Sequence, residues 1–426
     1  MKRVMKSFAV VAVVFCLLLA SCSRSNENNY DFESLPATVI LDWNEVAFKA
    51  FDGPVYQHSL MASRINAMTH IAMHDAINAV YAKYAVYAFN GKDETADPVA
   101  AAVTAAHTVL LHEIPARKSF LDSALQQSLS AITDSEAKTK GIVLGKQAGQ
   151  AIIDNRNNDG SAGDPVAAIP PSDVPGVYQA VPPFDFVFAP NWQNVKLFAL
   201  QSKNQFRSAP QPALNSPEYA AGFNEVKEIG KLNSSTRTTE QTSYAKFWYE
   251  FSEAGWNRVA RTIVMNKKMG LYEAARMLAL VDMALADAYI AGWDSKFHYN
   301  FWRPYTAIRA AATDGNESTS PDVAWEPAEP TPPVHDYPST HSALGNAAAK
   351  VIARIVGDNT PFTMTSFTAV PAGSTRSFSS LSQAANENAD SRVMAGIHFR
   401  FSCNAGQALG DKIGNWTVEN HLKPIK

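Results

Sequence analysis

Apolar residues at helical spacing run through most of this chain and limit its fold more than any other feature. In the segment 58–84, Leu60, Ile65, Met68 and Ile71 fall on one face of a helix. Comparable patterns cover 97–112, 119–132, 135–155, 216–232, 239–251, 254–269, 271–293, 339–356, 383–397 and 405–418. Few stretches alternate with a period of two, so we predict an all-α protein with little sheet.

Composition excludes several classes of protein. The 426 residues are 46% hydrophobic and 18% charged, which is ample material for a large core. The net charge of −3 argues against a protein held on nucleic acid mainly by net positive charge, although it allows a local basic patch. Three cysteines exclude a disulfide framework and argue against a Cys-based zinc or iron–sulfur site.

The first 21 residues have the pattern of an export leader. A positively charged start precedes the apolar run 8–20, which is too short for a comfortable membrane span. The sequence Leu-Ala-Ser-Cys ending at Cys22 resembles a bacterial lipobox, which implies that Cys22 is lipidated; an ordinary cleaved signal peptide or a signal anchor is the alternative. We expect a signal peptide (1–21), a polar tether (22–38) and a single helical domain (39–426). The protein is then exported and lipid-anchored in the bacterial cell envelope, with the outer membrane as the expected location.

Three short segments in the last third carry residues suited to chemistry. In the first, Lys296 and Arg303 lie seven apart, which on a helix puts both cations on one face, and Pro304 ends that helix near Arg303. Two cations on one face suit an oxyanion, although such pairs are usually solvated. A proline-rich loop (321–338), of a kind that is often functional, leads into the second segment.

The second segment is Pro338-Ser339-Thr340-His341 at the start of an Ala-rich helix. Free backbone N–H groups at a helix start favour an anion, Ser339 adds a hydroxyl and His341 a proton. The alternative is a simple Ser N-cap with an incidental histidine. In the third segment, Arg392 and His398 lie six apart. Arg392 is a candidate third cation and His398 a candidate nucleophile or ligand. The alternative is a helix with a surface Arg and a core His.

Taken together, the order Lys-x6-Arg-Pro, Pro-Ser-x-His, Ser-Arg-x5-His resembles the signature of one superfamily. It joins type 2 phosphatidic acid phosphatases, bacterial acid phosphatases and vanadium-dependent haloperoxidases. Trp293 resembles the site aromatic of the peroxidase branch, and a looser likeness to bacterial haloperoxidase-like proteins extends from about residue 40. The resemblance implies two four-helix-bundle-like halves with an oxyanion site in the C-terminal half.

The family's site residues carry over to matching positions here. The resemblance implies that Lys296, Arg303 and Arg392 neutralise a vanadate, with Ser339 and the amide of Thr340 as further donors. His398 then bonds to vanadium and His341 transfers protons. The implied activity is oxidation of a halide by hydrogen peroxide, with iodide or bromide favoured over chloride and a small organic compound as a further substrate; oligomeric state is open. The alternative is a phosphomonoester hydrolase with a phospho-histidine intermediate, in which phosphate occupies the same site.

Two positions depart from the family pattern. Thr340 stands where Gly is commonest, so a β-branched side chain must fit near the oxyanion. Ser402 stands where many members have an Asp that orients the second histidine. Asp294 and Asp336 are candidate carboxylate partners for His341, and His335 and His298 are further residues near the site. His70 and His74 lie four apart on one helix face, where we favour packing over metal binding.

Overall fold

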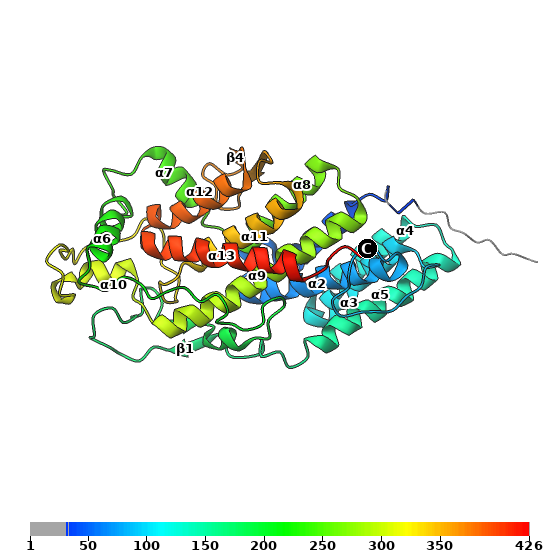
Figure 1. The fold of residues 1–426 in the computed structure, drawn as a ribbon, viewed down its shortest axis with the longest axis horizontal. Helices are drawn as coiled ribbons and strands as arrows, with labels where there is room; N and C mark the ends of the chain where they lie inside the picture. Colours follow the sequence, from blue (N-terminus) through cyan, green and yellow to red (C-terminus); the bar gives the residue numbers. More distant parts are fainter. Residues whose placement is uncertain (1–30, 33, 426) are drawn as a thin grey trace, which may run out of the picture. The chain divides into compact units, whose positions relative to one another are not determined.

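Helix α9 (Leu271–Tyr299) runs through the middle of the fold and contacts helices from both halves of the chain (Figure 1). Its residues are buried on every side from Leu271 to Lys296 with few exceptions, and many are alanines. A helix that is apolar all round must be surrounded by other helices. The computed structural model describes residues 31, 32 and 34–425. The expected leader, the lipidation site Cys22 and most of the tether lie outside the described residues, so the predicted division into leader, tether and domain stays a prediction.

The N-terminal helices form one group, in which α1 and α2 contact α9. They are α1 (Thr38–Ala50), α2 (Ser59–Val80), α3 (Pro98–Glu113), α4 (Lys118–Ser130) and α5 (Glu136–Asn155). Helix α2 contacts α3, α5 and α9 and is almost entirely buried. Side-chain caps fix two of the helix starts: Asp97 accepts from Ala100 N at α3, and Ser135 accepts from Lys138 N at α5. Helix α1 begins at the end of the expected tether and was not among the predicted helices.

The C-terminal helices form a second group, in which α8, α11 and α13 contact α9. They are α6 (Pro217–Ile229), α7 (Thr239–Phe247), α8 (Ser252–Lys267), α10 (Pro304–Arg309), α11 (Thr340–Val356), α12 (Leu381–Met394) and α13 (Arg400–Asn420). Helix α11 is central here and contacts α13, α9, α12 and α8. Short 3-10 turns connect the elements: η1 (Gly53–Val55), η2 (Pro115–Arg117), η3 (Pro190–Asn194) and η4 (Ala311–Thr313).

Glycines spaced four apart let two helix pairs approach closely. On α13, a Cβ at Gly406, Gly410 or Gly414 would lie 2.2, 2.2 or 2.6 Å from a backbone oxygen of Ser339 or of helix α11. On α5, Gly141 and Gly145 face backbone oxygens near α3 in the same way. Only glycine permits this spacing between the backbones, so these stripes set how deeply α13 packs against the helix that follows Ser339.

Two small antiparallel ribbons complete the fold. Strand β1 (Val166–Ala168) pairs with β2 (Phe186–Phe188), with Val166 opposite Phe188. Strand β3 (Phe362–Thr365) pairs with β4 (Thr375–Phe378), with Phe362 opposite Phe378. The predicted all-α architecture with little sheet is confirmed. Among the described residues, no single helix is long and apolar enough to cross a membrane, while the bent pair Pro98–Glu113 and Pro115–Ser130 meets those two criteria together.

The expectation that Lys296 and Arg303 share one helix face is wrong. Helix α9 ends at Tyr299, and Arg303 has extended backbone angles (φ −85°, ψ 158°) as the N-cap of α10. Pro304 at the first position of α10 fixes that cap. The two cations still converge, because the chain turns back between them and does not continue as helix.

Candidate active site

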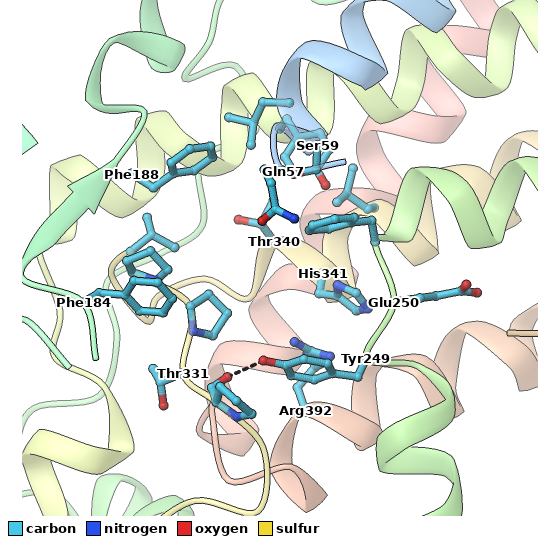
Figure 2. Close-up of a pocket in the computed structure, with 18 of the residues that line it drawn as sticks. Gln57, Ser59, Phe184, Phe188, Tyr249, Glu250, Thr331, Thr340, His341 and Arg392 are labelled. Atoms are coloured by element: carbon cyan, nitrogen blue, oxygen red, sulfur yellow. Dashed lines mark hydrogen bonds between the residues drawn. The ribbon is translucent and has the colours of Figure 1, made fainter. Parts of the chain in front are cut away.

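A cavity of about 590 Å³ lies where the three predicted segments meet. Its floor is formed by Lys296, Arg303, Arg392, His341 and His398. Its walls come from both halves of the chain, because Tyr56 and Ser59 lie at the start of α2 and Leu344 lies on α11. Figure 2 shows His341 and Arg392 on one side of the cavity and Phe184 and Phe188 on another.

The proline-rich loop before α11 holds two of the cations through backbone oxygens. Lys296 Nζ donates to His335 O (2.6 Å) and Asp336 O (2.9 Å), and Arg303 Nε donates to Val334 O (2.6 Å). Prolines donate no N–H, so this loop presents mainly acceptors to its neighbours. Burial, and then the neighbouring Arg303, hold the pKa of the Lys296 amine well below its usual value.

Arg392 is the least compensated of the three cations. It is 3% exposed, its Nη1 donates to Trp248 O (3.2 Å), and its Nε has no hydrogen-bond partner among the described residues. Burial lowers its pKa to about 10. Within the described part of the chain, no carboxylate forms a salt bridge with Arg392 or Lys296, and only Asp336 lies near Arg303 (3.9 Å). The floor therefore carries three buried positive charges against one negative charge.

His398 lies in the turn between α12 and α13, and the carboxylate beside it comes from the loop before α11. Its Nδ1 lies 2.8 Å from Asp336 Oδ1, and the Ser402 hydroxyl donates to Asp336 Oδ2. Burial raises the pKa of Asp336 to about 6, against the opposing effect of Arg303 and Lys296. Ser402 stands at the position where the family pattern commonly has an Asp. Here its hydroxyl holds Asp336, the carboxylate that lies beside His398 in place of that Asp.

The hydrogen bonds also assign the tautomer of His398. Arg303 Nη1 lies 3.0 Å from His398 Nε2 and 3.4 Å from Nδ1, and because a guanidinium can only donate, the nearer Nε2 is the favoured acceptor. Asp336, whose Oδ1 lies 2.8 Å from Nδ1, electrostatically favours the proton on that nitrogen. Burial, and then Arg303 and Lys296, hold the pKa of His398 well below its usual value, so the ring is neutral and Nε2 carries a lone pair.

His341 has different partners from those expected. Its Nε2 donates to Trp248 O (2.7 Å), and its Nδ1 accepts from the Ser252 hydroxyl (2.9 Å). Burial, and then Arg392, hold its pKa well below the usual value. Neither Asp294 nor Asp336 is the partner of His341: Asp336 belongs to His398, and Asp294 pairs with Arg207 (2.6 Å). Both ring nitrogens of His341 are thus engaged within the protein, although the residue lines the cavity.

Ser339 and Thr340 begin helix α11 as expected. Ser339 is the N-cap and its oxygen accepts from Ser342 N (3.4 Å) and the Ser342 hydroxyl (3.0 Å), which leaves its own O–H available as a donor. The Thr340 side chain is turned toward α9, where a Cβ at Gly292 would lie 2.8 Å from its Oγ1. Gly292 thereby makes room for the β-branched residue that replaces the usual Gly.

The structure also shows where the remaining residues predicted from the sequence lie. Trp293 lines the cavity and its Nε1 donates to Phe188 O (3.1 Å). His335 is buried between the rings of Tyr178 and Phe297, and burial lowers its pKa to about 3. His298 is exposed and outside the cavity lining. His70 and His74 are buried in α2 with partners inside the fold, His70 with Asp282 (2.6 Å) and His74 with the backbone oxygen of Ala85 (3.0 Å).

Sequence reasoning missed several residues that shape the site. Ser252 and Trp248 hold His341, and Gly292 accommodates Thr340, yet none of them lies in the three segments. A glycine in the middle of an otherwise apolar helix is a signal for close approach and points to Gly292. No local pattern marks Ser252 or a backbone oxygen.

Three comparisons with known proteins agree with this geometry. Residues 276–426 match the family model described as the VCPO second helical-bundle domain. The vanadium chloroperoxidase of Curvularia inaequalis is 29% identical over 205 residues, which are 40% of this chain; the alignment spans about a third (33%) of that relative's length.

Solved structures extend the likeness to nearly the whole chain. A bacterial vanadium-dependent iodoperoxidase superposes with a TM-score of 0.80 at 26% identity, covering 92% of this chain and 98% of the other. A holo-type bacterial vanadium-dependent chloroperoxidase shares the fold, with a TM-score of 0.70 at 17% identity over 86% of this chain and 93% of the other. The chain thus has the fold of vanadium-dependent haloperoxidases, and its C-terminal part is similar in sequence to theirs.

Proposed function

We propose that this protein is a vanadium-dependent haloperoxidase that uses hydrogen peroxide to oxidise iodide or bromide. The observation that carries the proposal is the excess of buried positive charge around the free nitrogen of His398. Lys296, Arg303 and Arg392 contribute three positive charges and Asp336 one negative charge, which leaves the floor at +2. Buried charges without partners are costly, so the floor favours an oxyanion of opposite charge.

The residues present fit vanadate in a specific way. His398 Nε2 has a lone pair, and its only close partner among the described groups is the Arg303 guanidinium. The orphaned Arg392 Nε is an unused donor at the floor, and the hydroxyl of Ser339, which precedes the lining residue Thr340 in the chain, is a second unused donor. We propose that His398 Nε2 binds vanadium while the three cations, Ser339 and the amide of Thr340 hold its oxygens. When bound, vanadate supplies the Lewis-acidic centre that activates hydrogen peroxide toward a halide.

The other residues of the floor orient groups and handle protons. Asp336 keeps the proton on Nδ1 of His398 and so keeps Nε2 free. His341 is neutral, and after leaving Trp248 it can accept or deliver a proton at Nε2 or Nδ1. Position 334, close to the floor, is a valine with no hydrogen-bond donor. This favours iodide or bromide over chloride, and the structural likeness to an iodoperoxidase supports the same choice.

The test separates the peroxidase from a phosphatase that uses the same oxyanion site. Protein stripped of oxyanions is given orthovanadate, hydrogen peroxide and each halide, and the same sample is assayed on a phosphomonoester. We expect halide oxidation that requires vanadate and disappears in His398→Ala. His298→Ala is the matched control, because His298 is exposed and outside the cavity. Phosphatase activity inhibited by vanadate, with no halide oxidation, would overturn the proposal.

We also propose that the chain is exported and anchored through a lipid on Cys22, on the basis of its leader sequence. Cys22→Ser should move the protein from the membrane fraction to the soluble fraction of the cells that express it. Unchanged fractionation of the variant would contradict the anchor.

A further inference from the structure

The first described residues of the chain lie beside the beginning of helix α9. Pro36 pairs with Gly270, the N-cap of α9, in an isolated β-bridge. The ring of Phe32 stacks on Tyr81 at the end of α2, with the ring centroids 4.7 Å apart. The chain therefore enters the described domain, which is one compact unit of residues 31–426, next to the first turn of α9.

Large apolar side chains are exposed around this entry point. Tyr81, Met265 and Ile425 are 41%, 58% and 53% exposed. Met265 lies in the last turn of α8, five residues before Gly270. Ile425 N donates to Lys83 O (3.0 Å), which holds the C-terminal segment beside the end of α2. Exposed apolar side chains that gather on one part of a surface indicate an interaction site.

Three exposed lysines stand among these apolar side chains. Lys267 ends α8 and Lys268 is its C-cap, and Lys423 lies two residues before Ile425. In the described part of the chain, none of the three lysines forms a salt bridge. Lysines beside apolar side chains are typical of surfaces that rest on a membrane, where the ammonium groups reach the lipid headgroups.

The neighbouring acidic groups leave this surface with an excess of positive charge. Glu273 in the first turn of α9 is paired with Lys83, and Asp31 is an exposed carboxylate at the start of the described chain. The three lysines and Asp31 together leave two positive charges. We call this surface the entry face, and its residues are Asp31, Phe32, Tyr81, Met265, Lys267, Lys268, Lys423 and Ile425.

The entry face and the cavity floor lie at opposite ends of α9. Tyr272, at the start of the helix, contacts Tyr81, with the ring centroids 5.8 Å apart. Arg276 Nε donates to Leu422 O (2.6 Å) near the C-terminus, whereas Lys296 at the other end belongs to the floor. In Figure 1 the C-terminus lies beside one end of α9 and strand β1 near the other. From residue 272 to residue 296 a helix rises about 36 Å, which separates the face from the floor.

We propose that the entry face docks the protein on an anionic phospholipid surface. Tyr81, Met265 and Ile425 enter the headgroup region with their apolar parts, and the lysines lie against lipid phosphates. A protein docked in this way holds the cavity, where the proposed oxidation takes place, at the far end of α9 from the lipid. The docking goes beyond the proposed haloperoxidase function and does not depend on the chemistry in the cavity.

The proposed lipid on Cys22 favours the same orientation. Nine residues join Cys22 to Asp31, and an extended chain of that length spans at most about 32 Å. This span is shorter than the stretch of helix between the entry face and the floor. A lipid on Cys22 would therefore hold the entry face, and not the cavity end, at the membrane.

The first arm of the test measures binding without the lipid. The chain from residue 22 onward is purified as Cys22→Ser and sedimented with phosphatidylcholine vesicles that contain or lack phosphatidylglycerol. We expect binding that requires phosphatidylglycerol and weakens as salt is added. Lys267→Ala with Lys268→Ala should weaken it about 25-fold, which is about fivefold for each lysine. Met265→Ser should weaken it about tenfold, because an apolar side chain is lost.

Lys146→Ala with Lys412→Ala is the matched control, because both lysines are exposed and lie on α5 and α13, outside the entry face. Melting curves show that each variant is folded. Equal binding to both kinds of vesicle, or equal weakening by the two lysine pairs, would overturn the proposal. A dimer in solution that Met265→Ser dissociates would assign the face to a second copy of the chain and would overturn it as well.

The second arm measures which end of the protein meets the lipid. A polarity-sensitive dye is attached to Met265→Cys or to Phe367→Cys, since Phe367 is exposed and lines the cavity. The remaining Cys403 is buried. Phosphatidylglycerol vesicles should shift the emission of the dye at residue 265 to the blue and leave that at residue 367 unchanged. A shift at residue 367, or none at residue 265, would overturn the orientation. Cell fractionation tests the lipid anchor separately, so failure of the anchor and failure of the docking are distinguishable.

Discussion

At the scale of single residues, the position of one proton decides what His398 can do. Its Nδ1 lies 2.8 Å from Asp336 Oδ1, and Ser402 donates to the second oxygen of the same carboxylate. The carboxylate precedes the Pro-Ser-Thr-His segment, and the serine follows His398 by four residues. The pair performs the orienting role that a single Asp after the histidine has in many relatives.

Asp336→Asn should weaken vanadate binding while the protein remains folded. An amide at this position no longer favours the proton on Nδ1, and loss of a partner that orients a metal ligand typically costs 10- to 100-fold in affinity. Vanadate affinity measured by calorimetry checks this. Ser402→Ala should have a smaller effect in the same direction, because the carboxylate remains. An unchanged affinity in Asp336→Asn would show that Asp336 does not orient His398.

Gly292 and Thr340 form a second residue-scale pair. Gly292→Ala should destabilise the protein by about 1–3 kcal/mol, because the new methyl group would meet Thr340 Oγ1 and Cγ2 at 2.8 and 3.0 Å. In a Thr340→Gly background the same change should cost much less, since its obstacle is gone. Urea unfolding of the two single variants and the double variant measures this. Additive losses would mean that the two residues do not interact.

At the scale of elements, the helix that begins at Ser339 is held in place by the glycine stripe of α13. Ser339 N donates to Ser402 O (2.9 Å), so the two helices are also tied at the entrance of the site. Because the site residues lie at helix starts, in loops and on α9, their geometry depends on how closely whole helices pack.

Gly410→Ala should separate α13 from α11. The added Cβ would lie 2.2 Å from Ala343 O, which is backbone and cannot rotate away. We expect a loss of about 1–3 kcal/mol in the free energy of unfolding, in spite of the higher helix propensity of alanine. Asn404→Ala, on an exposed position of the same helix, is the matched control and should be neutral or slightly stabilising. Equal stabilities of the two variants would contradict the close approach.

At the scale of the whole molecule, buried carboxyl groups connect segments that are distant in sequence. Asp75 accepts three successive backbone N–H groups from Tyr87 to Phe89, and Asp287 accepts three from Phe198 to Leu200. Glu253 joins Tyr56 near α2 to Tyr289 on α9. Stability should therefore depend on pH through groups that lie far inside the protein.

Burial raises the pKa of Glu253 from 4.5 to about 7. A carboxyl with a raised pKa binds its proton more tightly in the folded state, so its contribution is full below about pH 4.5 and is lost as pH rises to about 7. Relative to Glu253→Gln, the free energy of unfolding of the wild type should fall by about 3.4 kcal/mol over this interval and then level off. Denaturant titrations of both proteins at several pH values measure the difference. Parallel curves would show that Glu253 does not titrate there.

The amino-acid sequence was sufficient to predict the helical class, most helix positions and the identity of the floor residues. Apolar spacing and the three short segments are local patterns. They can be recognised in the sequence because the residues that form them are separated by fixed intervals. The spacing misled at Arg303, because a helical interval says nothing about where a proline lets the helix stop.

Which side chains contact one another in the site could be seen only in the tertiary structure. It paired Asp336 with His398 and not with His341, turned Thr340 into the space left by Gly292, and engaged both nitrogens of His341 with Trp248 and Ser252. It also gathered aromatic rings from β2 and the α7–α8 connection around one cavity. These contacts join residues tens to hundreds of positions apart. They depend on the packing of helices and on backbone oxygens, which carry no signature in the amino-acid sequence.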